Sequence, residues 1–490
     1  MKKTITLTID LILISSPTLM LISHGVHYFI KLVTHTPFLK RCCLLMPTLL
    51  CIVVHVSGQD YLEKYVTDGL RNNEVVEQKN IGLEKALLSL RIAKGMFMPS
   101  VTLQGSYTSG NGGRSISLPI GDMLNPVYTT LNQLTDSHQF PQVENVNQNF
   151  FPTNFYDARI HTVMPILNTD LLYSHKIRQQ QVMLQEFEVR IYKRELVENI
   201  KVAYFSYLGA TEVVKIYKGS LEFAEEGRRV NTSLLSNGRG LPAYLLRAQS
   251  EIENINAQII DSERQAHNAQ LYFNFLLNRD GDALILADEN NGKQFTPTED
   301  NLVESSATTS REELNQLRQL VLLNQTINRM DQSYWIPRIN GFADFGSQSQ
   351  NWIVNNQSRF YLVGLQLDIP LFAGFTNRNK IRLSQLNVKN SELDYSVKSK
   401  QLDIRMQVVK NELITAYQNH RSAEKQLEAA RSYQRLIDKG YKEGSNTFIE
   451  TLDARAQLTA AQLKTIISQY HIMIADAHYE RESASFPLNN

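Results

Sequence analysis

The sequence has little cysteine, no excess of either charge and no long apolar run beyond its first 58 residues. Its three cysteines, Cys42, Cys43 and Cys51, all lie in that first segment. The remainder therefore has no disulfide framework, cysteine nucleophile or cysteine metal ligand. A net charge of +1 over 490 residues offers no basic surplus for binding nucleic acid. After residue 58, no stretch approaches the ~18 consecutive apolar residues of a transmembrane helix.

Residues 1–58 have the features of an export signal. A basic pair at 40–41 precedes an apolar run over 42–56, and small residues follow. This order is typical of a secretory signal, so we expect cleavage after Gly58. A second apolar run over 11–30 leaves a retained membrane anchor as the alternative. An exported protein without an apolar helix is periplasmic, secreted or an outer-membrane β-barrel.

The rest of the chain is an internal duplication. Residues 163–167, Val-Met-Pro-Ile-Leu, match 368–372, Asp-Ile-Pro-Leu-Phe, and Gly238 matches Gly444 at an offset one residue longer. Self-similarity of this kind indicates repeated structural units. Each repeat reads as helix, strand, loop, strand, very long helix, turn and long helix.

The duplication sets the expected domain boundaries. A first repeat over 59–283 and a second over 309–485 are joined by a linking segment, 284–308. We expect strands near 99–109, 155–165, 336–346 and 358–371, and long helical hairpins over 170–280 and 374–485. The first repeat carries about 33 extra residues between its strands, roughly 110–153. They are rich in Gly, Asn, Gln and Pro, so we expect a loop there.

The expected strands alternate with period two. Tyr361, Val363 and Leu365 share one face of the fourth strand, whereas Arg159 and His161 share the polar face of the second. Apolar outside and polar inside is the pattern of a water-filled membrane barrel. A soluble sheet with one buried face alternates in the same way.

The hairpin helices favour the barrel without settling its stoichiometry. Residues 374–440 hold no proline, and at ~1.5 Å per residue they form a rod of about 100 Å. Their apolar positions recur every 11 residues, which suits helices standing side by side as staves. A two-stranded coiled coil is also compatible with this pattern. Four strands cannot close a barrel in lipid, so two copies would supply eight strands and three would supply twelve.

These repeats resemble the TolC-like outer membrane efflux protein family over about 60–485. The resemblance lies in the strand-to-helix passages 165–167 and 370–374 and in the helix-turn passage 441–454. It implies an internally duplicated α+β membrane protein. Three chains, with four strands each, would share a 12-stranded transmembrane β-barrel, continued by a long α-helical periplasmic barrel.

The resemblance also implies what the protein does. It implies a passive exit channel in the cell outer membrane, part of a tripartite efflux pump or type I secretion system. A homotrimer would work with a periplasmic adaptor and an inner-membrane transporter, exporting small molecules or polypeptides. It implies no enzymatic activity, no catalytic residue, no cofactor, no metal and no nucleic-acid partner. The alternative is a periplasmic coiled-coil scaffold or adaptor without a channel.

By the same resemblance, Glu450 and Asp453 occupy the periplasmic constriction. Their i, i+3 spacing places both on one helix face, so three chains would form two rings of carboxylates that favour cations. Solvated surface acids are the alternative interpretation. The tip, or latch, region comprises Tyr441, Gly444 and Asn446 in the second repeat and Gly238 and Tyr244 in the first. Asn446 stands where some members have arginine, and Tyr244 where some have an acid.

Overall fold

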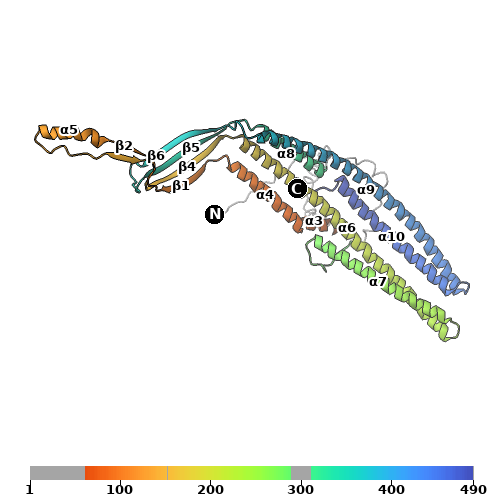
Figure 1. The fold of residues 1–490 in the computed structure, drawn as a ribbon. Helices are drawn as coiled ribbons and strands as arrows, with labels where there is room; N and C mark the ends of the chain where they lie inside the picture. The colour runs from red at the N-terminus through yellow and green to blue at the C-terminus, as the bar shows by residue number, and fades with distance from the viewer. Residues whose placement is uncertain (1–60, 152, 288–310, 489–490) are drawn as a thin grey trace, which may run out of the picture. The chain divides into compact units, whose positions relative to one another are not determined.

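Two repeats, each with a helical start, a pair of sheet strands and a long helical hairpin, make up the described chain, residues 61–151, 153–287 and 311–488 of a computed structural model (Figure 1). The first repeat contains α3 (Tyr61–Asn72), α4 (Glu74–Gly95), β1 (Ser100–Thr108), β4 (Phe155–Leu167), α6 (Thr169–Ser236) and α7 (Pro242–Leu276). The second contains α8 (Glu312–Gln332), β5 (Arg338–Gln350), β6 (Arg359–Asp368), α9 (Thr376–Lys442) and α10 (Phe448–Ser483). The predicted signal over 1–58 and most of the predicted 284–308 segment lie outside the described residues.

The hairpin helices are long because no proline interrupts them. Helices α6 and α9 have 68 and 67 residues, or about 100 Å each at ~1.5 Å per residue. The side chain of Asn168 caps the start of α6 by accepting from the backbone N–H groups of Asp170 and Leu171. Among the described helices, none is both long and apolar enough to cross a membrane.

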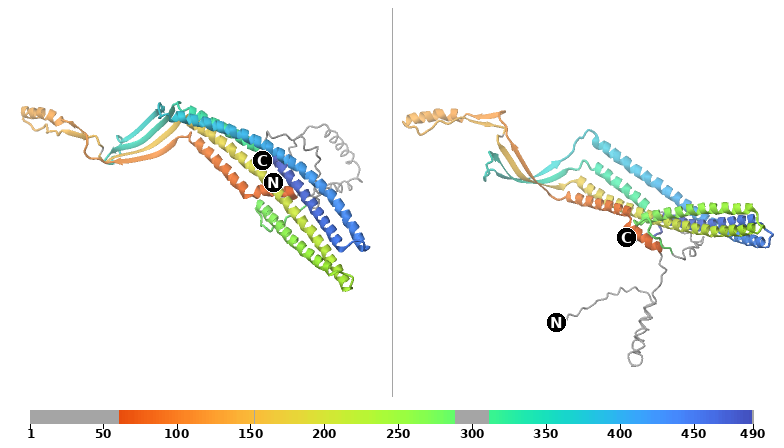
Figure 2. Two further views of the ribbon diagram at one scale, coloured as in Figure 1. Left: turned by 45° about the vertical axis from the view of Figure 1, so that its right-hand side comes forward. Right: turned by 90° about the horizontal axis from the view of Figure 1, so that it is seen from below.

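The two hairpins pack on each other. Helix α6 packs against α7, α9 packs against α10, and α6 also packs along α10, which joins the repeats (Figure 2). The main core lies where α3, α6 and α7 meet, and it includes the fully buried Ile200, Tyr204 and Phe273. Apolar burial at this junction holds α3 and the end of α7 against the middle of α6.

The strands form an antiparallel sheet in the order β1-β4-β5-β6. One end of the sheet continues into the helices, and we call the other end, where β1 stops at Thr108 and β4 starts at Phe155, its outer end. Within one chain, β1 and β6 each have an unpaired edge. Such edges are templates for pairing with another chain.

The expectation of a loop over 110–153 is wrong. This segment, which we call the outer extension, holds a two-stranded ladder of β2 (Ser115–Leu118) and β3 (Val146–Asn149), with helix α5 (Ile120–Leu134) between them. Its asparagines, which suggested turns, instead bind backbone groups of the segment returning from α5. The extension begins and ends at the outer end of the sheet (Figure 1).

A junction anchors the helix that precedes each strand pair. In the first repeat, the buried Asn73 caps α4, and its Nδ2 donates to the carbonyl of Leu276 at the end of α7, at 2.9 Å. In the second repeat, Arg311 directly precedes α8 and forms ion pairs with Glu313 and with Glu482 near the end of α10. An amide and a guanidinium therefore occupy corresponding places in the two repeats.

The second junction is a charged network. The side chain of Arg311 is 1% exposed, and Arg481 also pairs with Glu313 at 2.6 Å. Burial on its own would raise the pKa of Glu313, but hydrogen bonds and charges from Arg311 and Arg481 lower this pKa to about 2. Nearby, burial and repulsion from Glu480 raise the pKa of Asp476 to about 6.

Candidate functional site

One face of the sheet is apolar and exposed. Leu103, Ile160, Phe345 and Tyr361 lie in register across its four strands. All four are exposed, Leu103 and Tyr361 to 81% each. Monomeric soluble proteins rarely leave such a continuous apolar surface open. The row therefore indicates a surface that lipid covers, as on the outside of a membrane barrel.

The opposite face is polar and internally bonded. Nδ1 of His161 is hydrogen-bonded to the carboxylate of Asp344. The guanidinium of Arg159 lies 3.8 Å from Asp344 and 3.9 Å from Asp157, and its Nε donates to Gln104 at 3.3 Å. A face of fixed charges and amides suits a water-filled lumen. The exposed apolar face and the polar face together favour a membrane barrel over a soluble sheet with one buried face.

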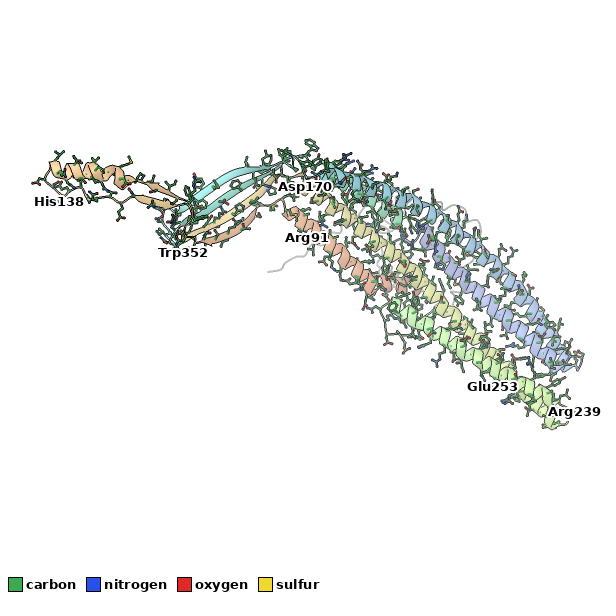
Figure 3. All side chains as sticks on the ribbon, in the orientation of Figure 1. Arg91, His138, Asp170, Arg239, Glu253 and Trp352 are labelled. Carbon is green, nitrogen blue, oxygen red and sulfur yellow. The ribbon has the colours of Figure 1, made fainter. Side chains whose placement is uncertain are left out.

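The hairpin tips lie at the end of the helices that is farthest from the sheet. Figure 3 shows Arg239 at the tip of the first hairpin and Trp352 near the outer end of the sheet. Gly238 and Gly444 adopt φ of +68° and +79°, which glycine adopts without strain. Each donates its N–H to a carbonyl three residues earlier, Leu235 or Tyr441. The two turns therefore have matching geometry, as the duplication predicts.

Glu450 is bound at the second tip. Its carboxylate accepts from the backbone N–H of Thr447 at 2.6 Å and from Nδ2 of Asn446 at 3.2 Å. Thr447 in turn caps the N–H of Glu450, so the pair forms a capping box at the start of α10. Hydrogen bonds from the backbone and then the side chains lower the pKa of Glu450. The side chain is thus exposed, ionised and held at the turn.

Asp453 lies one turn further along α10, is also exposed and accepts from Nε2 of Gln457 at 2.8 Å. The structure leaves both carboxylates on the surface of the single chain. It brings Asn446 against Glu450, but it shows no hydrogen bond from Asn446 to Gly238 or Tyr244 within the described residues. The pore-lining role of the two acids remains a prediction.

An aromatic cluster joins the two tips. Tyr244 of α7 and Tyr441 of α9 pack on the buried Phe448, with ring centroids 5.8 and 6.3 Å away, and Ala248 completes the cluster. Burial raises the pKa of the Tyr441 hydroxyl, and the electrostatic effect of the nearby Tyr244 raises this pKa further. The predicted latch residues Tyr244 and Tyr441 therefore meet through Phe448. Packing of aromatic rings therefore links the two tips.

Arg455 ties α10 to α6. Its guanidinium donates to the carbonyl of Gly219 at 3.1 Å and lies 4.9 Å from the centroid of the Phe223 ring. Burial lowers its pKa, with Asp438 opposing the shift. Cation–π contact and the hydrogen bond compensate for its partial burial.

Sequence reasoning missed Phe448, Arg455 and the capping box. The motif Thr447-x-x-Glu450 was readable as a helix start. Phe448 and Arg455 gave no such signal, because both contact helices about 200 residues earlier in the chain. Here the ring of Phe448 lies against Gly227 of α6, where a Cβ would come within 3.1 Å of it.

Comparisons with known proteins agree with this geometry. Residues 305–478 match the family model described as outer membrane efflux protein. The alkaline protease secretion protein AprF of Pseudomonas aeruginosa is 20% identical over 329 residues, which cover 65% of this chain and 68% of that protein.

Solved structures match nearly the whole described chain. The Campylobacter jejuni CmeC outer membrane channel is 14% identical with a TM-score of 0.69, covering 86% of this chain and 85% of that one. The outer membrane protein VceC of Vibrio cholerae is 12% identical with a TM-score of 0.69, covering 86% and 95%. The predicted α+β fold class is thereby confirmed. The family-model match over 305–478 and the shared fold over both repeats show that this chain is similar to outer membrane efflux proteins.

Proposed function

We propose that the chain is a passive outer-membrane exit channel that conducts small molecules or polypeptides from a periplasmic pump to the exterior. The observation that carries this function is the sheet with an exposed apolar face, a polar inner face and two unpaired edges. Open edges are not viable in lipid. The sheet therefore needs strands from other copies, and the likeness to outer-membrane channels supports a trimer with twelve strands.

The helical hairpins extend the conduit into the periplasm. With three chains, α6, α7, α9 and α10 supply twelve helices around one axis, and their tips form the inner end. Glu450 and Asp453 would then provide two rings of three carboxylates at this end. Rings of fixed negative charge favour cations over anions.

A passive channel has no energy source of its own, so it needs partner proteins that drive export. An inner-membrane transporter supplies the energy, and a periplasmic adaptor connects it to the hairpin tips. AprF is an alkaline protease secretion protein, and CmeC is an outer membrane channel. Both small-molecule efflux and type I secretion are therefore compatible with this chain, and neither requires covalent chemistry from it.

Single-channel recording in a planar bilayer tests the proposal. Detergent-extracted wild-type protein is expected to be trimeric and to give small, cation-selective steps. The Glu450→Gln/Asp453→Asn variant is expected to lose cation selectivity and to conduct more, because six charges leave the inner end. Glutamine preserves the capping box, so the variant separates charge from folding.

The outcomes distinguish the channel from its gate. Steps that do not change in the variant keep the channel and remove the two acids from its constriction. Folded trimer without any conductance contradicts the channel. Protein that is extracted without detergent and never conducts supports the periplasmic scaffold instead.

A further inference from the structure

Helix α5 of the outer extension carries a largely exposed apolar stripe. Ile120, Leu124, Val127, Leu131 and Leu134 follow one another at steps of 4, 3, 4 and 3 residues. This spacing keeps all five on one face of the helix. Val127 is 51% exposed and Leu134 is 78% exposed. An apolar face this regular normally has a partner.

The neighbouring face of α5 is already covered by the chain itself. Asn125 exchanges two hydrogen bonds with the backbone of Val143, at 2.8 and 2.9 Å. Asn132 does the same with Phe140, at 2.8 and 3.1 Å, and the Phe140 ring packs on Tyr128. These contacts fix the rotation of α5 about its axis. The apolar stripe is therefore held facing away from the returning segment.

The position of the extension brings copies of α5 together. The extension leaves the sheet from Thr108 of β1 and returns at Phe155 of β4, with His138 near its far end (Figure 3). Strand β1 has an unpaired edge, which another copy of the chain closes in the proposed channel. Each outer extension thus starts beside an interface between copies, and three of them surround the outer mouth.

We propose that the α5 helices of three copies pack against one another through this stripe and form a helical cap that narrows the outer mouth. The proposal rests on the trimeric channel proposed above. Alternating steps of 4 and 3 are the spacing with which identical helices mesh in a coiled coil. The stripe contains no charged residue that would repel its own copies, since Asp122, the acidic residue of α5, lies on the far side with Thr129 and Gln133.

The charge pattern favours copies of the chain over a lipid surface. Helices that lie on membranes carry Lys and Arg on their polar face, where they bind anionic headgroups. Helix α5 contains neither residue, and its charged group is an acid. The whole segment 109–154 has one basic residue, Arg114, against three acids, Asp122, Asp136 and Glu144.

Disulfide cross-linking tests the contact. Val127→Cys places a thiol in the stripe, and Gln133→Cys places a matched thiol on the polar face. In both variants Cys42, Cys43 and Cys51 are replaced by serine, so that each chain has one cysteine. Oxidation of the outer-membrane protein is expected to link most Val127→Cys trimers into covalent dimers plus monomer, with at least fivefold less product for Gln133→Cys.

Conductance tests the narrowing. The Leu124→Gln/Val127→Gln variant is expected to conduct at least twofold more than wild type, because polar side chains weaken the cap. Gln133→Ser, on the polar face, is expected to conduct like wild type. Cross-linking without any conductance change in the double variant would overturn the cap.

The remaining outcomes separate this proposal from the channel itself. A conducting trimer in which Val127→Cys does not cross-link overturns the cap and leaves the channel intact. In that case, reaction of the thiol with an impermeant maleimide indicates an open face, and protection indicates cover by lipid or another protein. Protein that is not trimeric overturns both proposals.

Discussion

The two repeats solve the same mechanical problem with different chemistry. Each must fix the helix that precedes its strand pair to the end of its helical hairpin. The first repeat does so with Asn73, a neutral amide that bonds to the carbonyl of Leu276. The second uses Arg311 between two carboxylates. The comparison teaches that duplication preserved the geometry of the junction, while its response to pH and charge became specific to the second repeat.

The two repeats also differ at their outer ends and at their inner tips. At the outer end, β1 and β4 are joined through the outer extension, whereas β5 and β6 are joined by a short connection in which Trp352 stacks on Tyr107 and Tyr156. At the inner tips, α10 starts with the capping box, whereas α7 starts after Leu241 without a side-chain cap. The repeats therefore differ most where the proposed conduit opens and closes.

Removing the charge of Arg311 is expected to lower the free energy of unfolding more than any other change at the two junctions. Arg311→Met removes the buried cation that Glu313 and Glu482 share and leaves these acids only Arg481 and Arg405, and breaking a buried ion pair costs about 3–5 kcal/mol. Denaturant unfolding of the detergent-solubilised protein measures the loss. The control is Arg405→Met, which removes the more exposed partner of Glu482 and is expected to cost less than about 1 kcal/mol. Equal losses of unfolding free energy in the two variants would contradict the conclusion that Arg311 holds the second junction together.

Asp476→Asn is expected to stabilise the protein above pH 6. The folded pKa of Asp476 is raised to about 6 from an unfolded value of 3.8. The native state therefore binds the proton more tightly, and stability falls as pH rises through this window. Asparagine does not titrate, so the variant gains up to about 3 kcal/mol at pH 7 relative to wild type. Melting temperatures at pH 4 and pH 7 check this, and a gain that is equal at both pH values rules out titration.

Asn73→Ala is expected to destabilise the first repeat by about 1–3 kcal/mol, because it removes both a helix cap and a buried hydrogen bond. Asn168→Ala is the matched control, since Asn168 also caps a helix with two backbone hydrogen bonds. Unfolding free energies compare the two variants. A smaller loss for Asn73→Ala than for Asn168→Ala would show that the contact with Leu276 contributes nothing.

The smallest expected effect is at the inner tip. Glu450→Gln keeps the capping box, whereas Glu450→Ala removes the carboxylate that accepts from Thr447 and Asn446. Hydrogen exchange of the amides at the start of α10 is expected to increase for alanine and to stay near wild type for glutamine. Amides at the start of α7, which has no such cap, provide the internal reference. Equal exchange in both variants would mean that the box does not hold this tip.

Local patterns made much of the fold predictable. Alternation with period two indicated the strands, and long runs without proline indicated the hairpins, because both signals lie within single elements. The strands and helices lie close to the expected ranges, with β5 over Arg338–Gln350 and α9 over Thr376–Lys442. The polar face with Arg159 and His161 also follows from alternation alone.

Features that depend on contacts between distant elements were not predictable. The segment 110–153, expected to be a loop, contains helix α5. Its overall composition hid this helix, because the asparagines that suggested turns belong to α5 and bind the returning segment. Phe448 and Arg455 were not predicted because both make contacts with the distant helices α6 or α7. The charged junction escaped because Arg311 and Glu482 are 171 residues apart.

The most direct test of a barrel shared between copies is cross-linking of the two unpaired edges. With the cysteines at 42, 43 and 51 replaced by serine, Leu103→Cys in β1 is combined in one chain with Tyr361→Cys, Val363→Cys or Leu365→Cys in β6. At least one pair is expected to give a covalent ladder that ends at three chains. Monomers at every pair, in protein extracted from the outer membrane, would contradict a sheet that closes through its own copies.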